Sequence, residues 1–349
     1  MPDIFDLVDS KNIATYYNTL QTNKVPYLGA ALFPAQKQAG LDLSWFKGSD
    51  GLPVMLAPSN FDAKATTRDR IGVSKIETEM PFFREQMRIG EKDRQEILKA
   101  SASSNAAIIN PIITRLYNDR VRLIDGSDVV AERMRMQLLS TGKIAISANG
   151  LKYDYDYRML AARKVTLAGV DKWSDPTAKV VTQIMGWQDS VETATGIRPI
   201  RAICTRKTWG YLLNNETIRK DMNPANAANL IMTDTLLKSY LLEKLGLTVA
   251  VYNKMYATEV GGASSLFYPD DKFTLIGSGN LGNTYFGTTP EEADLLSGGT
   301  NAQTQIVNTG VSVTTWKEVH PVNSITLVAA IVLPSFESID STFIATVSS

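Results

Sequence analysis

The stretch AERMRMQLLSTGKIAIS, residues 131–147, decides which fold this 349-residue chain is expected to adopt. Apolar residues recur at every fourth position over 130–138, as they do on the buried face of a helix. Gly142 is a natural C-terminal cap for such a helix. Apolar and polar residues then alternate, and Asn149-Gly150 is the most favoured dipeptide for a hairpin turn. The sequence therefore predicts a helix that runs directly into a two-stranded ribbon.

A second helical pattern precedes this stretch. Asn110 followed by Pro111 predicts a helix start, because asparagine caps helices and proline fits their first turn. Apolar residues then recur at helical spacing over 113–124, and Gly126 separates the two patterns. An interior glycine costs a helix only about 1 kcal/mol, so the sequence allows two helices or one rod of roughly thirty residues.

The N-terminal part of the chain contains too little apolar periodicity for a core of its own. Turn-forming glycine and proline recur at short intervals over 1–85. Two extended runs at 40–48 and 70–83 flank a polar stretch, which predicts a long projecting hairpin with its tip beginning near Pro58. A two-stranded ribbon is marginal alone. A neighbouring subunit is therefore expected to cover it, and a lid or a simple surface excursion remain the alternatives.

From Trp173 onward the pattern is that of a compact unit of alternating helices and strands. A helix is expected to open at Ser174, Asp175 and Pro176, to bury a stripe that includes Ala194, and to end at Gly196. Further helices are expected to follow Thr205 and to run from Thr233 to Gly246, with strands at 197–204, 247–253 and 273–277. The apolar C-terminal tail is expected to return to a sheet.

Composition argues against most catalytic classes. The chain has one histidine, His320, and one cysteine, Cys204, too few for a typical zinc site or a His-assisted nucleophile. We expect a partly exposed structural histidine and a buried inert thiol. The 36 basic and 36 acidic residues cancel, so no global field attracts nucleic acid or a membrane. No apolar stretch approaches 18 residues and the acidic start is unlike a secretory signal, so nothing directs the chain out of the cytoplasm.

Three glycines match a phosphate-binding pattern. Gly277, Gly279 and Gly282 in LIGSGNLG spell G-x-G-x-x-G directly after an apolar strand. That mechanism requires a helix N-terminus next, whereas Gly287 and Pro290 interrupt the sequence that follows. A glycine-rich hairpin turn is the preferred interpretation, and a nucleotide-binding enzyme is the alternative. We predict no catalytic residues, no metal site and no cofactor.

The junction at 131–147 resembles that of the major capsid protein E family of tailed bacteriophages, the lambda type. Other segments fall in the same order as in that family, so the resemblance covers nearly the whole chain. These segments are PYLGAALFPAQKQAGLDLSWFK (26–47), WSDPTAKVVTQI (173–184), LFYPDDKFTLIGSGNLGNTYFGTTPEE (266–292) and LPSFESIDSTFIATV (333–347).

The resemblance implies an α+β fold of the Hong Kong 97 capsid type, with a spine helix within 107–141. The implied parts are an N-terminal arm at 1–39, an extended loop at 40–82, a peripheral domain at 83–160, an axial domain at 161–319, and a C-terminal return strand to the peripheral domain at 320–349.

The resemblance also implies a function as a structural protein and not as an enzyme. The expected product is an icosahedral shell of hexamers and pentamers, built in the host cytoplasm, that encloses double-stranded DNA in the virion. Expected partners are other copies of the chain, scaffold and portal proteins, a decoration protein, and DNA through weak non-specific contacts, with no membrane. An encapsulin-like compartment that holds a cargo enzyme is the alternative with the same fold.

Five residues of the hairpin are candidate contacts between subunits. Arg68, Asp69 and Arg70 are charged and close to the predicted tip, where they are expected to form intersubunit ion pairs, with a solvated tip as the alternative. Trp45 and Phe46 lie on the first strand of the hairpin and are the apolar candidates.

Overall fold

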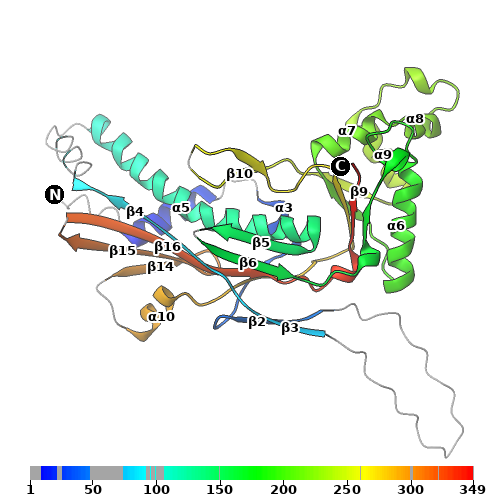
Figure 1. The fold of residues 1–349 in the computed structure, drawn as a ribbon. Helices are drawn as coiled ribbons and strands as arrows, with labels where there is room; N and C mark the ends of the chain where they lie inside the picture. Colours follow the sequence, from blue (N-terminus) through cyan, green and yellow to red (C-terminus); the bar gives the residue numbers. More distant parts are fainter. Residues whose placement is uncertain are drawn as a thin grey trace, which may run out of the picture. The chain divides into compact units, whose positions relative to one another are not determined.

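The computed structural model describes residues 9–21, 26–47, 74–91, 95, 99, 106–148, 150–259, 261–298, 302–320 and 322–348. The architecture is α+β, as predicted, with helices beside several separate sheets (Figure 1). The chain forms two compact units, each assembled from segments far apart in sequence. Unit 1 comprises Met1–Leu43, Glu77–Glu132 and Asn283–Ser335, and unit 2 comprises Ser44–Ile76, Arg133–Gly282 and Phe336–Ser349.

A single continuous helix, α5, spans Ala106–Thr141, so the structure shows one rod and not two helices. Gly126 lies inside it, and a Cβ at this position would meet nothing within 4 Å. The predicted start at Asn110-Pro111 is wrong, because Pro111 lies inside the helix. Proline removes one backbone hydrogen bond and crowds the preceding turn. A helix of 36 residues retains enough other hydrogen bonds to tolerate this near one end.

The predicted helix-to-ribbon junction is confirmed. The ribbon consists of β5 (Lys143–Ala148) and β6 (Leu151–Asp156), which pair antiparallel. Gly142 has a φ of 72° and donates its N–H to the Leu138 carbonyl at 2.8 Å, which ends the helix. Gly150, with a φ of 78°, lies in the turn of the ribbon. Both positions are in the left-handed region that glycine enters without steric cost.

Unit 1 contains a six-stranded sheet centred on β16, the strand-rich tail that the sequence predicts to return to a sheet. β16 pairs with β15 through its first part, with β4 over much the same length, and with β13 at its end. The strand order is β1-β13-β16-β15-β14, with β4 joining β16. The strands are β1 (Ala35–Lys37), β4 (Phe82–Ile89), β13 (Thr284–Phe286), β14 (Gln303–Val307), β15 (Val311–Val319) and β16 (Val322–Pro334).

The described part of unit 1 also contains the shorter helices α2 (Ser10–Gln21), α3 (Leu28–Leu32) and α10 (Pro290–Ser297). Tyr17 of α2 is fully buried and ties this helix to two other elements. Its hydroxyl donates to Asp128 Oδ2 at 3.0 Å and accepts from Asn308 Nδ2 at 3.0 Å. Burial raises the pKa of Tyr17, followed in effect by the charge of Asp128. The hydroxyl therefore stays protonated as a donor.

Unit 2 contains a five-stranded sheet in the order β7-β17-β12-β8-β9. β12 runs antiparallel to both of its neighbours, whereas β8–β9 and β17–β7 are parallel pairs. The core beneath it is rich in aromatic rings, with the centroids of Trp173 and Phe273 4.9 Å apart. The strands are β7 (Lys164–Thr166), β8 (Arg201–Cys204), β9 (Thr248–Val251), β12 (Lys272–Ile276) and β17 (Phe343–Thr346).

Of the three helices predicted for unit 2, two begin at their predicted caps. α7 (Arg206–Asn214) and α9 (Asp234–Leu245) begin after Thr205 and Thr233, whose side chains accept from backbone N–H groups as predicted. α6 (Val180–Thr195) ends at Gly196 but starts later than predicted, because Asp175 instead bonds to Thr177 in a turn. The predicted burial of Ala194 is wrong, because its side chain is exposed. Gln188 and Thr195 of the same helix are buried instead.

The remaining elements of the described residues are short. β2 (Asp42–Lys47) pairs with β3 (Ser74–Glu79), and β10 (Met255–Ala257) pairs with β11 (Ser264–Leu266). The other elements are α8 (Glu216–Met222) and the single 3₁₀ turns η1 (Ala161–Arg163), η2 (Gly169–Asp171), η3 (Ala227–Asn229) and η4 (Ile339–Ser341).

The glycine-rich segment is not the hairpin turn that the sequence suggested. β12 and β13, on either side of it, belong to different sheets, so the segment 277–283 connects two sheets. Arg201 holds it in place, since its guanidinium donates to the carbonyls of Gly277 and Gly279. The sequence predicts the two strands from their apolar residues, but it does not show that they join different sheets, so the hairpin turn was predicted wrongly.

The two units divide the chain differently from the predicted domains. The range 161–319 includes β13, β14 and β15, which lie in the sheet of unit 1, and the range 320–349 includes β17, which lies in the sheet of unit 2. Both differences arise because the chain leaves the sheet of unit 2 after β12, forms β13 to β16 in the sheet of unit 1, and returns to the sheet of unit 2 with β17. The domain boundaries themselves remain a prediction.

Candidate assembly surfaces

The ribbon of β2 and β3 is the first candidate surface. Among the described residues these two strands pair only with each other. This pairing confirms that the runs at 40–48 and 70–83 contain partner strands. An isolated two-stranded ribbon is marginal in stability. Its stability therefore depends on packing at its base or on a second molecule.

The base of the ribbon is held inside unit 1 by a close approach to Gly287. The Met80 N–H donates to the Leu41 carbonyl at 2.9 Å, which joins the chain entering the ribbon to the chain leaving it. A Cβ on Gly287 would lie 2.7 Å from Ile331 Cγ2, 2.8 Å from the Gly40 carbonyl and 2.9 Å from Met80 Cε. Only glycine fits between these atoms.

Of the five predicted contact residues, the structure describes the side chain of Trp45 alone. Arg68, Asp69 and Arg70 lie outside the described residues, so their predicted ion pairs stay a prediction. Phe46 belongs to β2, and its side chain is likewise outside the description. Trp45 is buried within its own chain against Tyr157, with ring centroids 5.2 Å apart, and both residues belong to unit 2. Most of its indole surface is therefore already covered.

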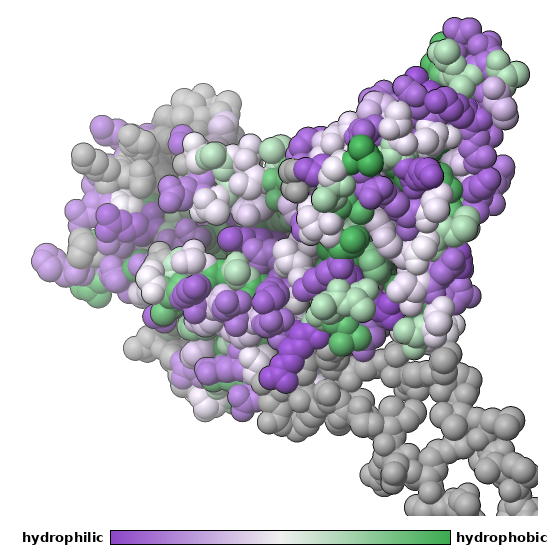
Figure 2. Space-filling model, turned by 45° about the vertical axis from the view of Figure 1, so that its right-hand side comes forward, coloured by the Kyte–Doolittle hydropathy of each residue, from purple (hydrophilic) through white to green (hydrophobic). Residues whose placement is uncertain are grey.

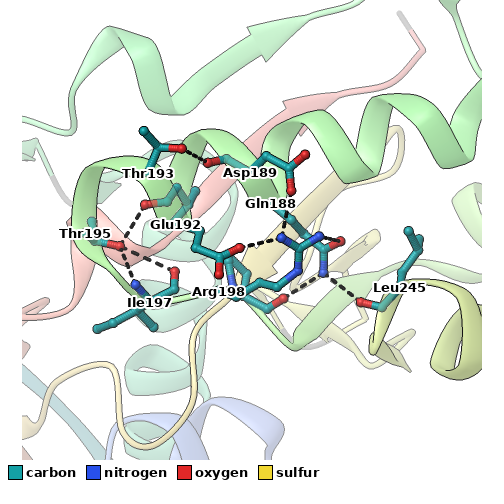
Figure 3. A network of polar contacts seen from close by, with 10 residues as sticks. Gln188, Asp189, Glu192, Thr193, Thr195, Ile197, Arg198 and Leu245 are labelled. Carbon is teal, nitrogen blue, oxygen red and sulfur yellow. Dashed lines mark hydrogen bonds and ion pairs between the residues drawn. The ribbon is translucent and has the colours of Figure 1, made fainter.

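The second candidate surface is the exposed side of α6 in unit 2, where Arg198 folds back over the helix (Figure 3). Its Nη1 lies 2.7 Å from Asp189 Oδ1 and 2.5 Å from Glu192 Oε2. The neighbouring Gln188 is fully buried, and its amide donates to the Pro199 carbonyl at 2.8 Å and to the Leu245 carbonyl at 3.2 Å. These bonds fix the segment that follows the helix.

That segment carries apolar side chains outward. Ile197 and Ile200 are 41% and 44% exposed, on either side of the anchored Arg198 and Pro199. On the face shown in Figure 2, small green apolar areas alternate with purple hydrophilic ones. Scattered exposed apolar residues are ordinary on a soluble surface. Ile197 and Ile200 lie on the segment that the bonds of Gln188 and Arg198 anchor, and they form the apolar part of this second candidate surface.

A third candidate lies between α8 and α9 of unit 2. A hollow of about 410 Å³ is lined in part by Asp221, Tyr240 and Lys244. Asp221 accepts from the Tyr240 hydroxyl and pairs with Lys244 Nζ at 3.0 Å, and these two bonds lower the pKa of its carboxyl. Leu242 of α9 is 54% exposed, and Ile231 in the loop that precedes α9 is 82% exposed.

The single histidine and the single cysteine lie in different environments. His320 is exposed in the turn after β15, in agreement with the predicted strand end. Cys204 is buried in β8, and burial raises the pKa of its thiol to about 12. A thiol with this pKa is almost entirely protonated at neutral pH and is a poor nucleophile. The prediction of a buried inert thiol agrees with this environment.

The phosphate-binding alternative lacks the geometry that it needs. Within the described residues the segment after Gly282 enters β13 directly, and the next helix, α10, starts only at Pro290. The next helix of the described chain therefore does not begin directly after the glycines, as the motif requires. No group of three or more His, Cys, Asp or Glu side chains among the described residues could hold a metal ion. No helix in the described part of the chain is both long and apolar enough to cross a membrane.

The chain was compared with known protein families and solved structures. The family model of phage major capsid protein E matches residues 9–347. A solved structure described as a prophage capsid protein from Escherichia coli CFT073 aligns with a TM-score of 0.62 at 17% identity, covering 98% of this chain and 99% of that chain. A phage-related protein from Bordetella bronchiseptica RB50 aligns with a TM-score of 0.53 at 11% identity, covering 97% of each chain. No curated protein matches the sequence.

Proposed function

The chain belongs to the phage major capsid protein E family, and on this premise we propose that it is the structural subunit of an icosahedral phage head. The match over residues 9–347 carries the proposal. The capsid fold predicted from the sequence agrees with the likeness to the prophage capsid protein. The subunit would form hexamers and pentamers that close into a shell around double-stranded DNA. A structural role of this kind requires no catalytic side chains.

The ribbon of β2 and β3 supports this proposal. A strand pair without further partners among the described residues gains stability when another molecule packs on it. In a closed shell every subunit has a neighbour related by symmetry, so each ribbon can be covered. Many modest interfaces then add up to a stable particle. The ribbon and the stretch between its strands correspond to the extended loop at 40–82.

The two units would form the two domains of a shell subunit. We assign the peripheral domain to the sheet around β16 in unit 1 and the axial domain to the sheet around β12 in unit 2. The N-terminal arm would be the part at 1–39. The exposed Ile197, Ile200, Ile231 and Leu242 of unit 2 would face neighbouring axial domains. These assignments make unit 2 the place to test contacts within a capsomer.

The proposal also names partners outside the shell itself. Assembly would take place in the host cytoplasm, with a scaffold protein and a portal protein, and a decoration protein would bind the finished virion. The balanced charge of the chain, 36 basic against 36 acidic residues, suits weak and non-specific contact with DNA. A strongly basic wall would instead hold DNA tightly through counterion release.

Electron microscopy of the purified full chain tests the proposal. We expect capsomers or closed particles, either spontaneously or after addition of the scaffold protein. A chain that stays monomeric with scaffold present would contradict it. Analysis of the contents of cell-derived particles separates the two kinds of shell, because a phage head would hold DNA and an encapsulin-like compartment would hold a cargo enzyme.

Charge reversal at the predicted tip tests the contact residues. Arg70→Glu is expected to weaken assembly at low salt, because it would break the predicted intersubunit ion pair. Exposed ion pairs are screened at higher salt, so the defect should shrink as salt rises. Lys254→Glu, in unit 2, is the control for an added negative charge. Unchanged assembly of the Arg70 variant would contradict the predicted pair.

A further inference from the structure

Two lysines share one face of the unit 2 sheet. Lys164 of β7 and Thr274 of β12 both stand directly opposite Ile344 of β17. Directly opposed residues in a sheet point to the same face. Lys272 stands opposite Thr346, two residues further along the same strand and therefore on the same face again. Lys164 and Lys272 are brought together although they are far apart in sequence.

The last turn of α5 rests on this face. The Thr274 hydroxyl donates to the Leu139 carbonyl at 2.7 Å, and Lys164 Nζ donates to the Thr141 carbonyl at 2.8 Å. These carbonyls belong to the end of the helix, where they lack partners within it. Lys272 Nζ donates to Thr346 Oγ1 at 2.6 Å. An ammonium group has three donors, so each lysine can also donate to a ligand.

A third lysine lies directly after the helix. Lys143 opens β5, its side chain is 51% exposed, and its Nζ lies 2.8 Å from Asp156 Oδ2. Asp156 stands opposite Lys143 in the ribbon. The Asp156 carboxylate also accepts the backbone N–H of Arg158 at 2.8 Å, and the Arg158 side chain is exposed. We call Lys143, Lys164 and Lys272 the lysine cluster.

The lysine cluster contains more positive than negative charge. Burial lowers the pKa of Lys164, with Asp156 opposing this shift and Lys143 adding to it. Burial also lowers the pKa of Lys272, and the charge of Lys164 lowers it further. The pKa of Lys143 is instead raised, because its side chain bonds to Asp156. An anion bound at the cluster would relieve the mutual repulsion of its ammonium groups.

We propose that the lysine cluster binds backbone phosphates of double-stranded DNA. The inference rests on the proposed function, because a head protein encloses DNA at high concentration. Lysine provides a compact point charge without the planar fork of arginine, which suits contact with phosphates irrespective of sequence. The cluster is small and the chain as a whole is neutral, so the binding is weak and depends strongly on salt.

The test measures binding of the purified full chain to a short fluorescent DNA duplex by anisotropy over a range of salt concentrations. Lys143→Glu is the main variant, because this side chain makes no bond to α5 and is half-exposed. Losing one phosphate contact lowers the salt slope by about 0.9, which corresponds to about eightfold weaker binding near 0.1 M salt. Lys272→Gln is expected to lower the slope by a similar amount.

Lys220→Glu is the matched control. This lysine also lies in unit 2, is 66% exposed, and pairs with a carboxylate, Glu216, at 3.2 Å. It should bind DNA like the wild type. Circular dichroism monitors folding of each variant, and Lys143→Gln replaces the main variant if charge reversal prevents folding. Equal binding by Lys143 and Lys220 variants would overturn the inference, and so would competition by polyglutamate as effective as that by DNA.

Electron microscopy of the same samples keeps the two proposals apart. If wild type and variants form particles but DNA binding does not depend on Lys143, the inference fails and the proposed function stands. If the wild type never forms capsomers, the proposed function fails, whereas the anisotropy result still decides whether the lysine cluster binds phosphates.

Discussion

Gln137 and Ala145 pair like neighbours in a β-sheet, although one lies in α5 and the other in β5. Gln137 Nε2 donates to the Ala145 carbonyl at 3.1 Å, and Gln137 Oε1 accepts the Ala145 N–H at 3.2 Å. A side-chain amide thereby serves the free edge of a strand as a backbone peptide would. The two bonds hold the ribbon along the last turns of the helix (Figure 1).

Replacing Gln137 should loosen this junction. Gln137→Ala removes both hydrogen bonds and is expected to lower the free energy of unfolding by about 1–2 kcal/mol. Gln137→Glu has nearly the same shape but cannot donate to the Ala145 carbonyl when ionised, so it should also be destabilising. Chemical denaturation monitored by circular dichroism measures both. A Glu variant as stable as the wild type would show that the donated bond contributes nothing.

Gly287→Ala should destabilise the base of the ribbon. The added Cβ would fall within 3 Å of atoms of Gly40, Met80 and Ile331. Overpacking of this kind costs about 1–3 kcal/mol. Thermal unfolding and the yield of assembled particles are the measurements. A Gly287→Ala protein that unfolds and assembles normally would contradict the close packing at this position.

Gly126→Ala should act in the opposite direction. Its Cβ would meet nothing within 4 Å, and the position is inside a helix of 36 residues. Alanine is favoured over glycine in a helix by about 0.5–1 kcal/mol. We expect a higher midpoint of denaturation, with assembly unchanged. A loss of stability would mean that this part of α5 is not a regular helix in solution.

Cys204 should resist modification in the native protein. Burial raises the pKa of its thiol to about 12, so thiolate becomes appreciable only when the pH approaches that value. An alkylating reagent at mildly alkaline pH should label the unfolded chain rapidly and the folded chain hardly at all. Mass spectrometry after timed exposure measures the difference. Equally rapid labelling of both states would contradict the buried environment of the thiol.

Local elements were the most predictable part of this protein. The end of α5 at Gly142 and the turn at Gly150 follow from the left-handed backbone that glycine enters, and the caps at Thr205 and Thr233 follow from hydroxyl side chains. All of these act within a few residues. The start of α5 was mispredicted at Pro111 because the local signal for a helix start was outweighed by the rest of the helix. A cap motif of a few residues does not show how far the packing of the whole helix extends it.

The candidate surfaces were less predictable. Trp45 was proposed as a contact because it is a large apolar residue on a hairpin strand, and the structure buries it against Tyr157. The lysine cluster had no signal in the sequence. Lys164 and Lys272 lie on two strands that both pair with β17, and only this pairing places them on one face. An alignment of related chains could have indicated such a pair through covariation.

The sequence alone determined the end of α5 at Gly142, the caps of α7 and α9, the two-stranded ribbon near the N-terminus, and a composition with one histidine and one cysteine. Each of these depends on periodicity, caps or composition, which act over a few residues. Tertiary structure alone decided that β13 and β12 join different sheets and that α5 ends on a face bearing Lys164. Pairing of distant strands depends on how the whole core packs, because the entropy cost of closing long loops must be met by many contacts formed together.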